Sequence, residues 1–297
     1  MNPCIIFNPV ARGEKAFRFR SHLAALSKQC ALKPTNAAGA GRALAAEAIS
    51  EGYDTLIAAG GDGTINEVLN GMGDVIGGFT HARLGVIPLG TINVFAKELG
   101  LPTSPEGAWQ IIQAGRETRI DLPQAEFTGA GQPLRRYFAQ LAGAGLDSRA
   151  IELVDWNLKK MVGPLAYVAA GIKALRGPMQ PITVSSPHGN AQGELVLIGN
   201  GRYYGGKINL FPQADLRDGR LDVTVFPKVN WVTLLRAGWG WLIDQIHQTA
   251  GAQSFQSESF TLASDQLKVP FELDGDNIGH LPVKFSVQRT ALRVLAP

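Results

Sequence analysis

Cysteine is scarce in this chain of 297 residues, and its two examples stand apart from any motif. Cys4 and Cys30 belong neither to a CxxC pair nor to a Cys/His cluster with the spacing of metal ligands. The five histidines are dispersed, without a pair at helical i, i+4 spacing, so we assign them no metal or catalytic role. This usage excludes a disulfide scaffold and favours a reducing, cytoplasmic setting.

Long hydrophobic runs are also missing. The N-terminus passes through Ile5, Ile6 and Phe7 and turns at Asn8-Pro9, so it lacks the apolar core of about 7 to 15 residues that a signal peptide carries. No stretch reaches the roughly 18 apolar residues of a membrane span. We therefore expect no transmembrane segment.

Neither sign of charge dominates, since the formal net charge is +3 with 18% charged and 45% apolar residues. Together with 35 glycines, this composition describes a folded, loop-rich α/β protein rather than a disordered or fibrous one. The small positive excess does not indicate nucleic-acid binding. The length exceeds the usual size of one domain, so two cores are expected.

The first 121 residues alternate between strand-like and helix-like runs. Strands are predicted at 4–7, 55–59 and 84–88, and helices at 17–29, 40–51, 65–71, 91–99 and 104–114. Such βα repetition predicts an α/β N-terminal domain (1–121) with a parallel, Rossmann-like sheet and a site at the C-terminal ends of its strands. The loops at Asn8, Gly60 and Pro88 each follow such a strand and are expected to converge.

Beyond residue 121 the pattern changes to short alternating runs. Strands are predicted at 137–141, 182–184, 194–200, 221–226, 259–263, 267–273 and 283–287, with helix-like stretches at about 149–176 and 230–248. A second, β-rich domain is therefore expected, with the break near Leu122-Pro123.

The most informative motif runs from Ala59 to Val68 and places three glycines and an acid between a strand and a helix. Thr64 is predicted to cap that helix, with Glu67 completing a capping box. The glycines allow close backbone approach, and the helix N-terminus favours an anion such as phosphate. Asp62 would repel phosphate unless it met Mg²⁺ or a hydroxyl, which favours phosphoryl transfer, although a plain glycine turn capped by Asp62 explains the motif equally well.

Three further turns carry chemistry of the same kind. Residues 88–102 repeat the strand, glycine and helix design, with Thr91 placed to cap the helix or to contact phosphate. Residues 8–13 form a turn with a basic residue, and residues 271–276 end a strand with Asp274 and Asp276 on either side of Gly275.

Together these motifs resemble the diacylglycerol kinase catalytic-domain family, in particular its soluble bacterial lipid kinases, which are related to the sphingosine kinases. The order matches over almost the whole chain: NP, GGDGTINEV, PLGTIN, an Asp-Gly-x-Leu element at 218–221 and a late Asp-Gly-acid. GGDG alone is shared with NAD kinases and phosphofructokinases. The combination is specific.

The resemblance implies a nucleotide-binding first domain, a β-sandwich lipid-substrate domain (122–289) and a tail (290–297) that returns to the first domain. It also implies the cofactors ATP and Mg²⁺, with Asp62 near the metal-bound phosphates. The residues it assigns to ATP are Asn8, Thr35, Gly60, Gly61, Asp62, Gly63, Thr64, Ile65, Asn66, Glu67 and Thr91. For Thr35, an ordinary loop threonine is an equal alternative.

By the same resemblance Asp276 is the general base, although the family usually has glutamate there and aspartate is one methylene shorter. Asp274 is the alternative base, but a turn residue before Gly275 explains it better. Val94 and Lys97 stand where the bacterial lipid kinases often have aspartate and arginine. Asp121 could supply a remaining acid or cap the domain boundary.

A structural metal site is implied at the Asp-Gly-x-Leu element. Asp218, with the backbone carbonyls of Leu221 and Val223, resembles the oxygen ligands of a structural Mg²⁺ in relatives. An ordinary hairpin turn accounts for Asp218-Gly219 equally well.

The tryptophan-rich stretch 230–243 would form a helix with an apolar stripe that includes Trp231, Leu235 and Trp239. Such a stripe suits a membrane interface, although packing on a core is the commoner use. Basic residues among apolar ones at 151–178 could attract anionic headgroups, although a solvated helix face explains the lysines nearly as well. The pattern is silent on oligomeric state.

These features predict an ATP- and Mg²⁺-dependent kinase that phosphorylates a lipid hydroxyl (diacylglycerol, phosphatidylglycerol or sphingoid-like) from the cytoplasm, with peripheral contact at the inner face of the membrane. The alternatives are an NAD kinase-like small-molecule kinase and a nucleotide- or lipid-binding relative without catalysis. The second alternative is motivated by Val94 and Asp276.

Overall fold

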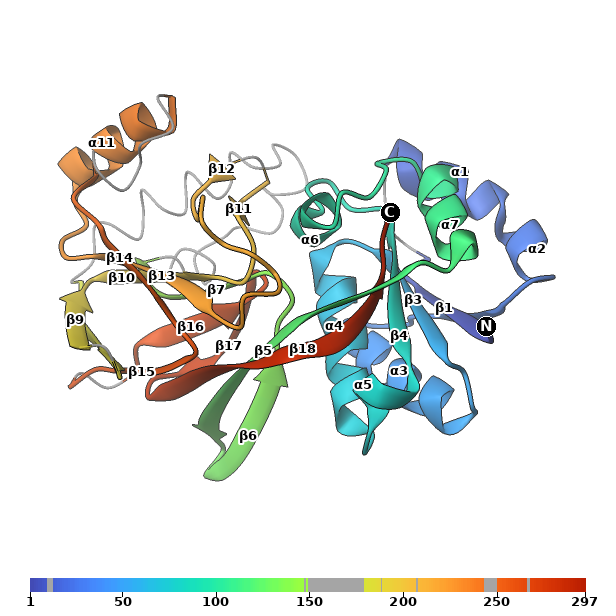
Figure 1. Cartoon of the computed structure of the whole chain (residues 1–297), viewed down its shortest axis with the longest axis horizontal. Helices are drawn as coiled ribbons and strands as arrows, with labels where there is room; N and C mark the ends of the chain where they lie inside the picture. Colours follow the sequence, from blue (N-terminus) through green and yellow to red (C-terminus); the bar gives the residue numbers. More distant parts are fainter. Residues whose placement is uncertain are drawn as a thin grey trace.

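The computed structural model describes residues 1–9, 13–146, 148, 179–187, 189–206, 208–242, 250–265 and 268–297. They form an N-terminal α/β part and a C-terminal part of mainly antiparallel strands (Figure 1). This is the fold class that the sequence predicts. The predicted helix at 149–176, the basic stretch 151–178 and the end of the predicted helix at 230–248 lie outside the described residues.

The N-terminal part is built on four parallel strands in the order β2-β1-β3-β4. Their bounds are β1 (Pro3–Phe7), β2 (Ala31–Pro34), β3 (Thr55–Gly60) and β4 (Arg83–Pro88). Every residue of β1 and β3 is buried, as expected for parallel strands with helices on both faces. β2 is the strand of this sheet that the sequence did not predict, because this short strand is only partly buried.

Helices cover both faces of this sheet. They are α1 (Glu14–Ser21), α2 (Leu23–Leu26), α3 (Ala40–Ser50), α4 (Asp62–Asp74), α5 (Gly78–His81), α6 (Val94–Glu98) and α7 (Pro105–Ala114). Cys4 and Ile6 of β1 pack with α3 and α4, whereas Ile5 and Phe7 pack with α1, α2 and α7. The alternation follows from the two-residue period of a strand. The helix predicted at 17–29 is divided between α1 and α2 at His22.

The C-terminal part is a sandwich of two sheets. The smaller sheet has the order β14-β13-β10-β7-β16-β17, and the larger sheet contributes β9, β8, β15, β18, β5 and β6. Between the sheets, the rings of Phe127 and Phe271 meet edge to face with centroids 5.0 Å apart, within a cluster of buried apolar side chains.

These elements have the following bounds: β5 (Glu117–Gly129), β6 (Gln132–Tyr137), β7 (Leu141–Gly145), β8 (Ile182–Ser186), β9 (Gly189–Gly193), β10 (Leu195–Gly199), β11 (Tyr203–Tyr204), β12 (Ile208–Asn209), β13 (Leu221–Phe226), α11 (Trp231–Leu242), β14 (Gln253–Ser257), β15 (Ser259–Ala263), β16 (Pro270–Leu273), β17 (Asp276–His280) and β18 (Val283–Leu295). The strand predicted at 137–141 is wrong. Residues 138–140 form the connection between β6 and β7. The amides of Ala139 and Gln140 donate to the carboxylate of Asp274 and not to a neighbouring strand.

Two strands of 13 residues, β5 and β18, run through both parts and pair with each other (Figure 1). Val294, near the end of β18, also pairs in parallel with Leu84 of β4, so the last strand lies in the N-terminal sheet. The boundary predicted at 121/122 falls inside β5. The pattern of short runs changes near Leu122-Pro123, but Pro123 sits within a continuous strand.

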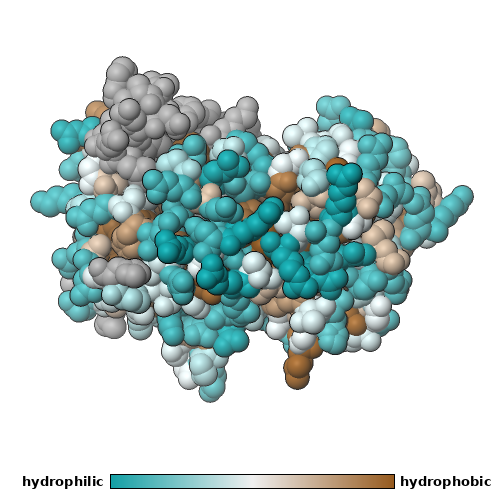
Figure 2. Space-filling view, in the orientation of Figure 1, coloured by the Kyte–Doolittle hydropathy of each residue, from teal (hydrophilic) through white to brown (hydrophobic). Residues whose placement is uncertain are grey.

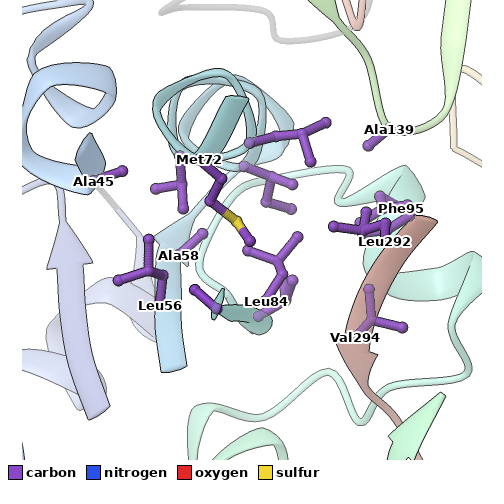
Figure 3. Close-up of a cluster of buried hydrophobic side chains, with 14 of the residues drawn as sticks. Ala45, Leu56, Ala58, Met72, Leu84, Phe95, Ala139, Leu292 and Val294 are labelled. Carbon is purple, nitrogen blue, oxygen red and sulfur yellow. The ribbon is translucent and has the colours of Figure 1, made fainter. Parts of the chain in front are cut away.

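The hydrophobic cluster on the α4 side of the sheet joins the two parts. In Figure 3, Met72 of α4 lies over Leu84, while Phe95 of α6 lies beside Leu292 of β18. Ala139 of the β6–β7 connection belongs to the same cluster. The N-terminal core is therefore completed by residues from the far end of the sequence.

One face of the molecule can be assessed for polarity from its residue hydropathy. The face shown in Figure 2 is largely hydrophilic, with hydrophobic residues in small separate areas. None of the helices in the described ranges combines the length and the apolar character that crossing a bilayer requires.

A buried carboxylate holds the junction where β5 and β18 cross between the parts. The pairing of these strands is interrupted between Gln288 and Leu292, and Thr290 there has a φ of 49°. Asp121, which is 0% exposed, accepts hydrogen bonds from the amides of Thr290 (2.7 Å) and Gly219 (2.6 Å). The sequence left two roles open for Asp121, a remaining acid of the site or a cap at the domain boundary, and the structure shows the cap.

Replacing Asp121 by alanine is expected to lower the free energy of unfolding by about 2 to 4 kcal/mol, because the buried amide of Gly219 and the partly buried amide of Thr290 lose their acceptor. Urea unfolding followed by circular dichroism measures this loss. The matched control is Asp215→Ala, since exposed Asp215 accepts one amide hydrogen bond in a turn and should change stability by less than about 1 kcal/mol. Equal losses in both variants would contradict the role of Asp121.

Candidate functional site

The predicted loops meet at the C-terminal edge of the parallel sheet. Asn8 follows β1 and Thr35 follows β2, and the Thr35 amide donates to the carbonyl of Phe7 at 2.8 Å. Gly60 of β3 is paired with Pro88 of β4 at the same edge. The sequence therefore predicted correctly that these loops converge.

The two glycine loops are fastened to each other. The amides of Leu89 and Gly90 both donate to the carbonyl of Gly60, at 2.8 and 3.3 Å. A Cβ on Gly90 would stand 2.7 Å from the Cα of Gly61, and a Cβ on Gly60 would stand 2.2 Å from Oγ1 of Thr64. Glycine is therefore required by close approach at both positions.

Helix α4 begins directly at this loop, at Asp62. Its N-cap is Gly61 in an extended conformation without a side-chain hydrogen bond, so the predicted cap at Thr64 is wrong. Thr64 lies instead in the first turn, against Gly60. The uncapped amides of a 13-residue helix and its positive end are directed at the glycine loop, which is the arrangement that binds anions.

Asp62 faces the start of α6. Its carboxylate accepts hydrogen bonds from the amides of Val94 (3.0 Å) and Phe95 (3.2 Å). Burial raises the pKa of the Asp62 carboxyl, the two amides oppose that rise, and the charge of Asp274 adds to it. Asp62 thus links the first glycine loop to α6, the helix that follows the second glycine loop.

Thr91 does not cap α6. The residue is exposed and precedes the helix, whose N-cap is Asn93 at a φ of 53°. The side chain of Asn93 exchanges hydrogen bonds with the backbone of Gly90, at 2.9 and 2.6 Å. The side chain of Val94 is buried, and its backbone amide donates a hydrogen bond to Asp62.

Glu67 points away from the glycine loop. Its two carboxylate oxygens accept the amides of Gly39 (2.7 Å) and Gly41 (2.8 Å) at the N-terminus of α3. The predicted capping box is therefore wrong, since Glu67 caps a different helix. This contact fixes the loop between Thr35 and α3 against α4.

Asn66 faces the second part of the chain rather than the glycine loop. Its side-chain amide donates to Asp274 (2.9 Å) and to the carbonyl of Tyr137 (3.3 Å). One turn later, Asn70 donates to the same carbonyl (2.9 Å) and accepts the Tyr137 amide (2.9 Å). The spacing i, i+4 puts both asparagines on one face of α4, and that face docks on the end of β6. Ile65 is fully buried in the core.

Asp274 is the centre of this contact. Besides Asn66, its carboxylate accepts the amides of Ala139 (2.8 Å), Gln140 (3.0 Å) and Leu141 (3.0 Å). Burial raises the pKa of the Asp274 carboxyl, and its hydrogen bonds oppose the rise. The backbone φ of 49° before Gly275 agrees with the predicted turn, but sequence reasoning missed the four-fold anchorage.

Asp276 stands on the other side of Gly275, exposed, at the first residue of β17. Its Oδ2 lies 3.8 Å from the position that a Cβ would take on Gly63. A carboxylate of the C-terminal part thus meets the first turn of α4. The rigid neighbour Asp274 determines where that carboxylate stands.

The Asp-Gly-x-Leu element lies outside this site. Asp218 accepts the amide of Arg220 (2.8 Å) in the turn before β13, and Gln256 donates toward it at 3.4 Å. Leu221 and Val223 lie in β13, paired with β14. Among the residues that the structure describes, no three His, Cys, Asp or Glu side chains gather as a metal-binding group.

Family profiles match nearly the whole chain. The diacylglycerol kinase catalytic domain matches residues 2–125, and the YegS C-terminal NAD kinase beta sandwich-like domain matches residues 140–296. Two solved structures from Bacillus anthracis str. Sterne share the fold. One, of a putative diacylglycerol kinase, has a TM-score of 0.79 at 21% identity over 100% of this chain and 95% of that chain. The other, of a diacylglycerol kinase, has a TM-score of 0.70 at 19% identity over 100% of this chain and 97% of that chain.

Curated relatives agree with the profiles. A diacylglycerol kinase of Staphylococcus saprophyticus is 31% identical over 308 residues, which cover 99% of this chain and 94% of that protein. A protein of Stenotrophomonas maltophilia named "Probable lipid kinase YegS-like" is 39% identical over 195 residues, which cover 62% of this chain and 60% of that protein. On these matches, and on the site geometry above, the chain belongs to the diacylglycerol kinase catalytic-domain family, a family of kinases.

Proposed function

We propose that this protein is an ATP- and Mg²⁺-dependent lipid kinase that transfers the γ-phosphoryl group to a lipid hydroxyl between its two parts. The observation that carries the proposal is the approach of Asp276 to Gly63, where Oδ2 would stand 3.8 Å from a Cβ on the glycine. It places an exposed carboxylate beside a helix N-terminus of the kind that binds phosphate. Names of relatives support the lipid acceptor.

The nucleotide phosphates are proposed to lie on the fastened glycine loops, against the amides of residues 61–64 at the start of α4. Asn8 and Thr35 stand at the same sheet edge and would contact the rest of the nucleotide, as would exposed Thr91. Glu67 and Asn66 support the site from behind, because their side chains hold α3 and β6.

The donors at the loop suit Mg²⁺, which prefers oxygen and retains water and phosphate ligands. Asp62 and Asp276 bring carboxylates to the loop, and the two oxygens of Asp62 also accept the amides of Val94 and Phe95 at the start of α6. When bound, the ion would neutralise charge on the transferring phosphates. The Asp218 site is a separate proposal for a structural ion.

In the proposed transfer, Asp276 accepts the proton of the lipid hydroxyl while the hydroxyl oxygen forms a bond to the γ-phosphorus. The bond from that phosphorus to the β–γ bridging oxygen breaks, and ADP leaves. Positioning and charge neutralisation are the main tasks of the protein in such a reaction. The shorter aspartate is compensated by the closeness of β17 to α4.

A lipid acceptor requires contact with a membrane surface, and α11 is the proposed contact. Trp231, Val232 and Leu235 are 52%, 53% and 74% exposed on its outer side. Lys228 and Arg236 are exposed beside them, and basic residues are attracted to anionic headgroups. Helix α11 lies on the same side of the molecule as α6 and the β11–β12 hairpin (Figure 1, top), so docking it would bring the site close to the lipid.

The direct test is transfer of labelled phosphate from ATP, with Mg²⁺, to diacylglycerol, phosphatidylglycerol or a sphingoid base in mixed micelles. Transfer to one of these acceptors is expected. Transfer to NAD alone would favour the NAD kinase-like alternative. No transfer to any acceptor, with retained ATP binding, would favour the inactive relative.

Asp276→Asn is expected to lower kcat about 100-fold or more, because an amide cannot accept the hydroxyl proton. The unfolding midpoint should not change, since the residue is exposed. Asp276→Glu, which restores the carboxylate, should retain most of the activity in the same phosphate-transfer assay. Equal activity of Asp276→Asn and wild type would exclude Asp276 as the base.

Asp274→Asn should behave in the opposite way. The new amide nitrogen cannot accept the backbone amides that the carboxylate holds, so the free energy of unfolding is expected to fall by about 2 to 4 kcal/mol. Urea unfolding of the two variants side by side separates the roles. A stable Asp274→Asn protein that lacks only catalysis would reverse the assignment.

Leu235→Glu is expected to weaken binding to phosphatidylglycerol-containing vesicles about tenfold, because an exposed apolar side chain is replaced by a charge. Co-sedimentation measures the change. Ile76→Glu is the matched control, since Ile76 is 98% exposed but follows the C-terminal end of α4, which is the end opposite the glycine loop. Equal loss in both variants would show that α11 has no special role.

A further inference from the structure

Helix α6 makes a contact that the proposed reaction does not use. Glu98, its last residue, has a side chain only 4% exposed, although it belongs to a short surface helix. Its carboxylate reaches the loop and hairpin after β10, in the C-terminal part. A charge that is buried in this way needs compensating partners.

The partners of Glu98 all come from the C-terminal part. One oxygen accepts Nε of Arg202 at 3.0 Å. The other accepts the amides of Arg202 (2.8 Å) and Tyr203 (3.3 Å) and the side-chain amide of Gln140 (3.2 Å). A Cβ on Gly201 would stand 2.6 Å from Cγ of Glu98, so the backbone approaches as closely as glycine allows.

The preceding residue makes a second contact to the same hairpin. Nζ of Lys97 lies 3.5 Å from the ring centroid of Tyr203 and donates to the carbonyl of Gly206 at 3.3 Å. A cation over an aromatic face is attracted by the ring quadrupole. Lys97 and Glu98 therefore hold β11–β12 from two adjacent positions.

The other end of α6 is held by Asp62, which accepts the amides of its first two residues. The five-residue helix is thus fixed to the phosphate loop at its start and to the C-terminal part at its end. Gln140 completes the connection, because its side chain donates to Glu98 while its backbone amide donates to Asp274. Asp274 is two residues from Asp276.

We propose that Glu98 is a positioning residue, and that its latch on Arg202, Tyr203 and Gln140, together with the Asp274 anchor, sets the distance between Asp276 and the glycine loops. This inference rests on the proposed function. Glu98 does not touch the reacting atoms. It acts by holding the lipid-side carboxylate at the spacing that transfer requires, and a misplacement of about 1 Å costs on the order of 100-fold in rate.

Steady-state kinetics of Glu98→Ala test the role. We expect kcat for phosphate transfer to the lipid acceptor to fall about 10-fold or more, whereas the KM for ATP should stay within about twofold, because the backbone hydrogen bonds that fasten the glycine loops to each other do not involve Glu98. Glu98→Gln, which retains one acceptor oxygen, should restore part of kcat. An unchanged kcat, or a parallel loss in ATP affinity, would overturn the proposal.

Gly201→Ala opens the latch by steric contact without removing the charge and should lower kcat in the same way. Glu51→Ala is the matched control, because Glu51 pairs with Lys33 wholly within the N-terminal part. Its kinetic constants should equal those of wild type.

A distance measurement separates this inference from the kinase proposal. Spin labels on Ile76→Cys and Gln253→Cys, both exposed and in different parts, report the spacing in a Cys30→Ser background, because Cys4 is buried. Glu98→Ala should broaden or shift the distribution, and Glu51→Ala should not. An unchanged distribution overturns the latch, whereas a shifted distribution in a protein that phosphorylates no lipid keeps the latch and overturns only the kinase proposal.

Discussion

Carboxylates that accept backbone amides from distant segments are the interaction on which this architecture depends. Asp62, Asp121 and Asp274 each accept two or more amides from residues far away in sequence. Glu67 and Glu98 do the same for the start of α3 and for the β11–β12 hairpin. A charge-assisted hydrogen bond of this type is stronger than a neutral one, and losing the acceptor leaves several buried donors unsatisfied. At these five junctions, acidic side chains provide the acceptors that a strand ladder would otherwise supply.

This arrangement separates rigid acids from an accessible one. Asp274 is saturated by four donors, and Asp276, two residues later, stands exposed beside Gly63. The same short turn therefore holds an anchor and a carboxylate that can meet a ligand. Because the anchor also binds Asn66 of α4, the position of the exposed acid follows the position of the phosphate loop.

The fold class and the meeting of the glycine loops could be predicted from the sequence, because both follow from local periodicity and from the parallel βα pattern. The caps could not. Thr64 and Glu67 have the spacing of a capping box, but the glycine at 61 already occupies the cap and Glu67 finds amides of another helix. The roles of Glu98 and Asp274 depend on partners between 42 and 208 positions away in sequence. The continuation of β5 through the expected boundary at 121/122 depends on its pairing with β18, which the local sequence does not show.

The placement of β18 has a consequence for the order in which the molecule forms. Its residues Leu292 and Val294 complete the core and sheet of the N-terminal part, beside β4, although most of the sequence separates them from Leu84. Contacts of such long range are made late in folding, because the intervening loop must be closed first. During synthesis the first part therefore leaves the ribosome with an open strand edge at β4, and that edge can close only when the rest of the chain has arrived.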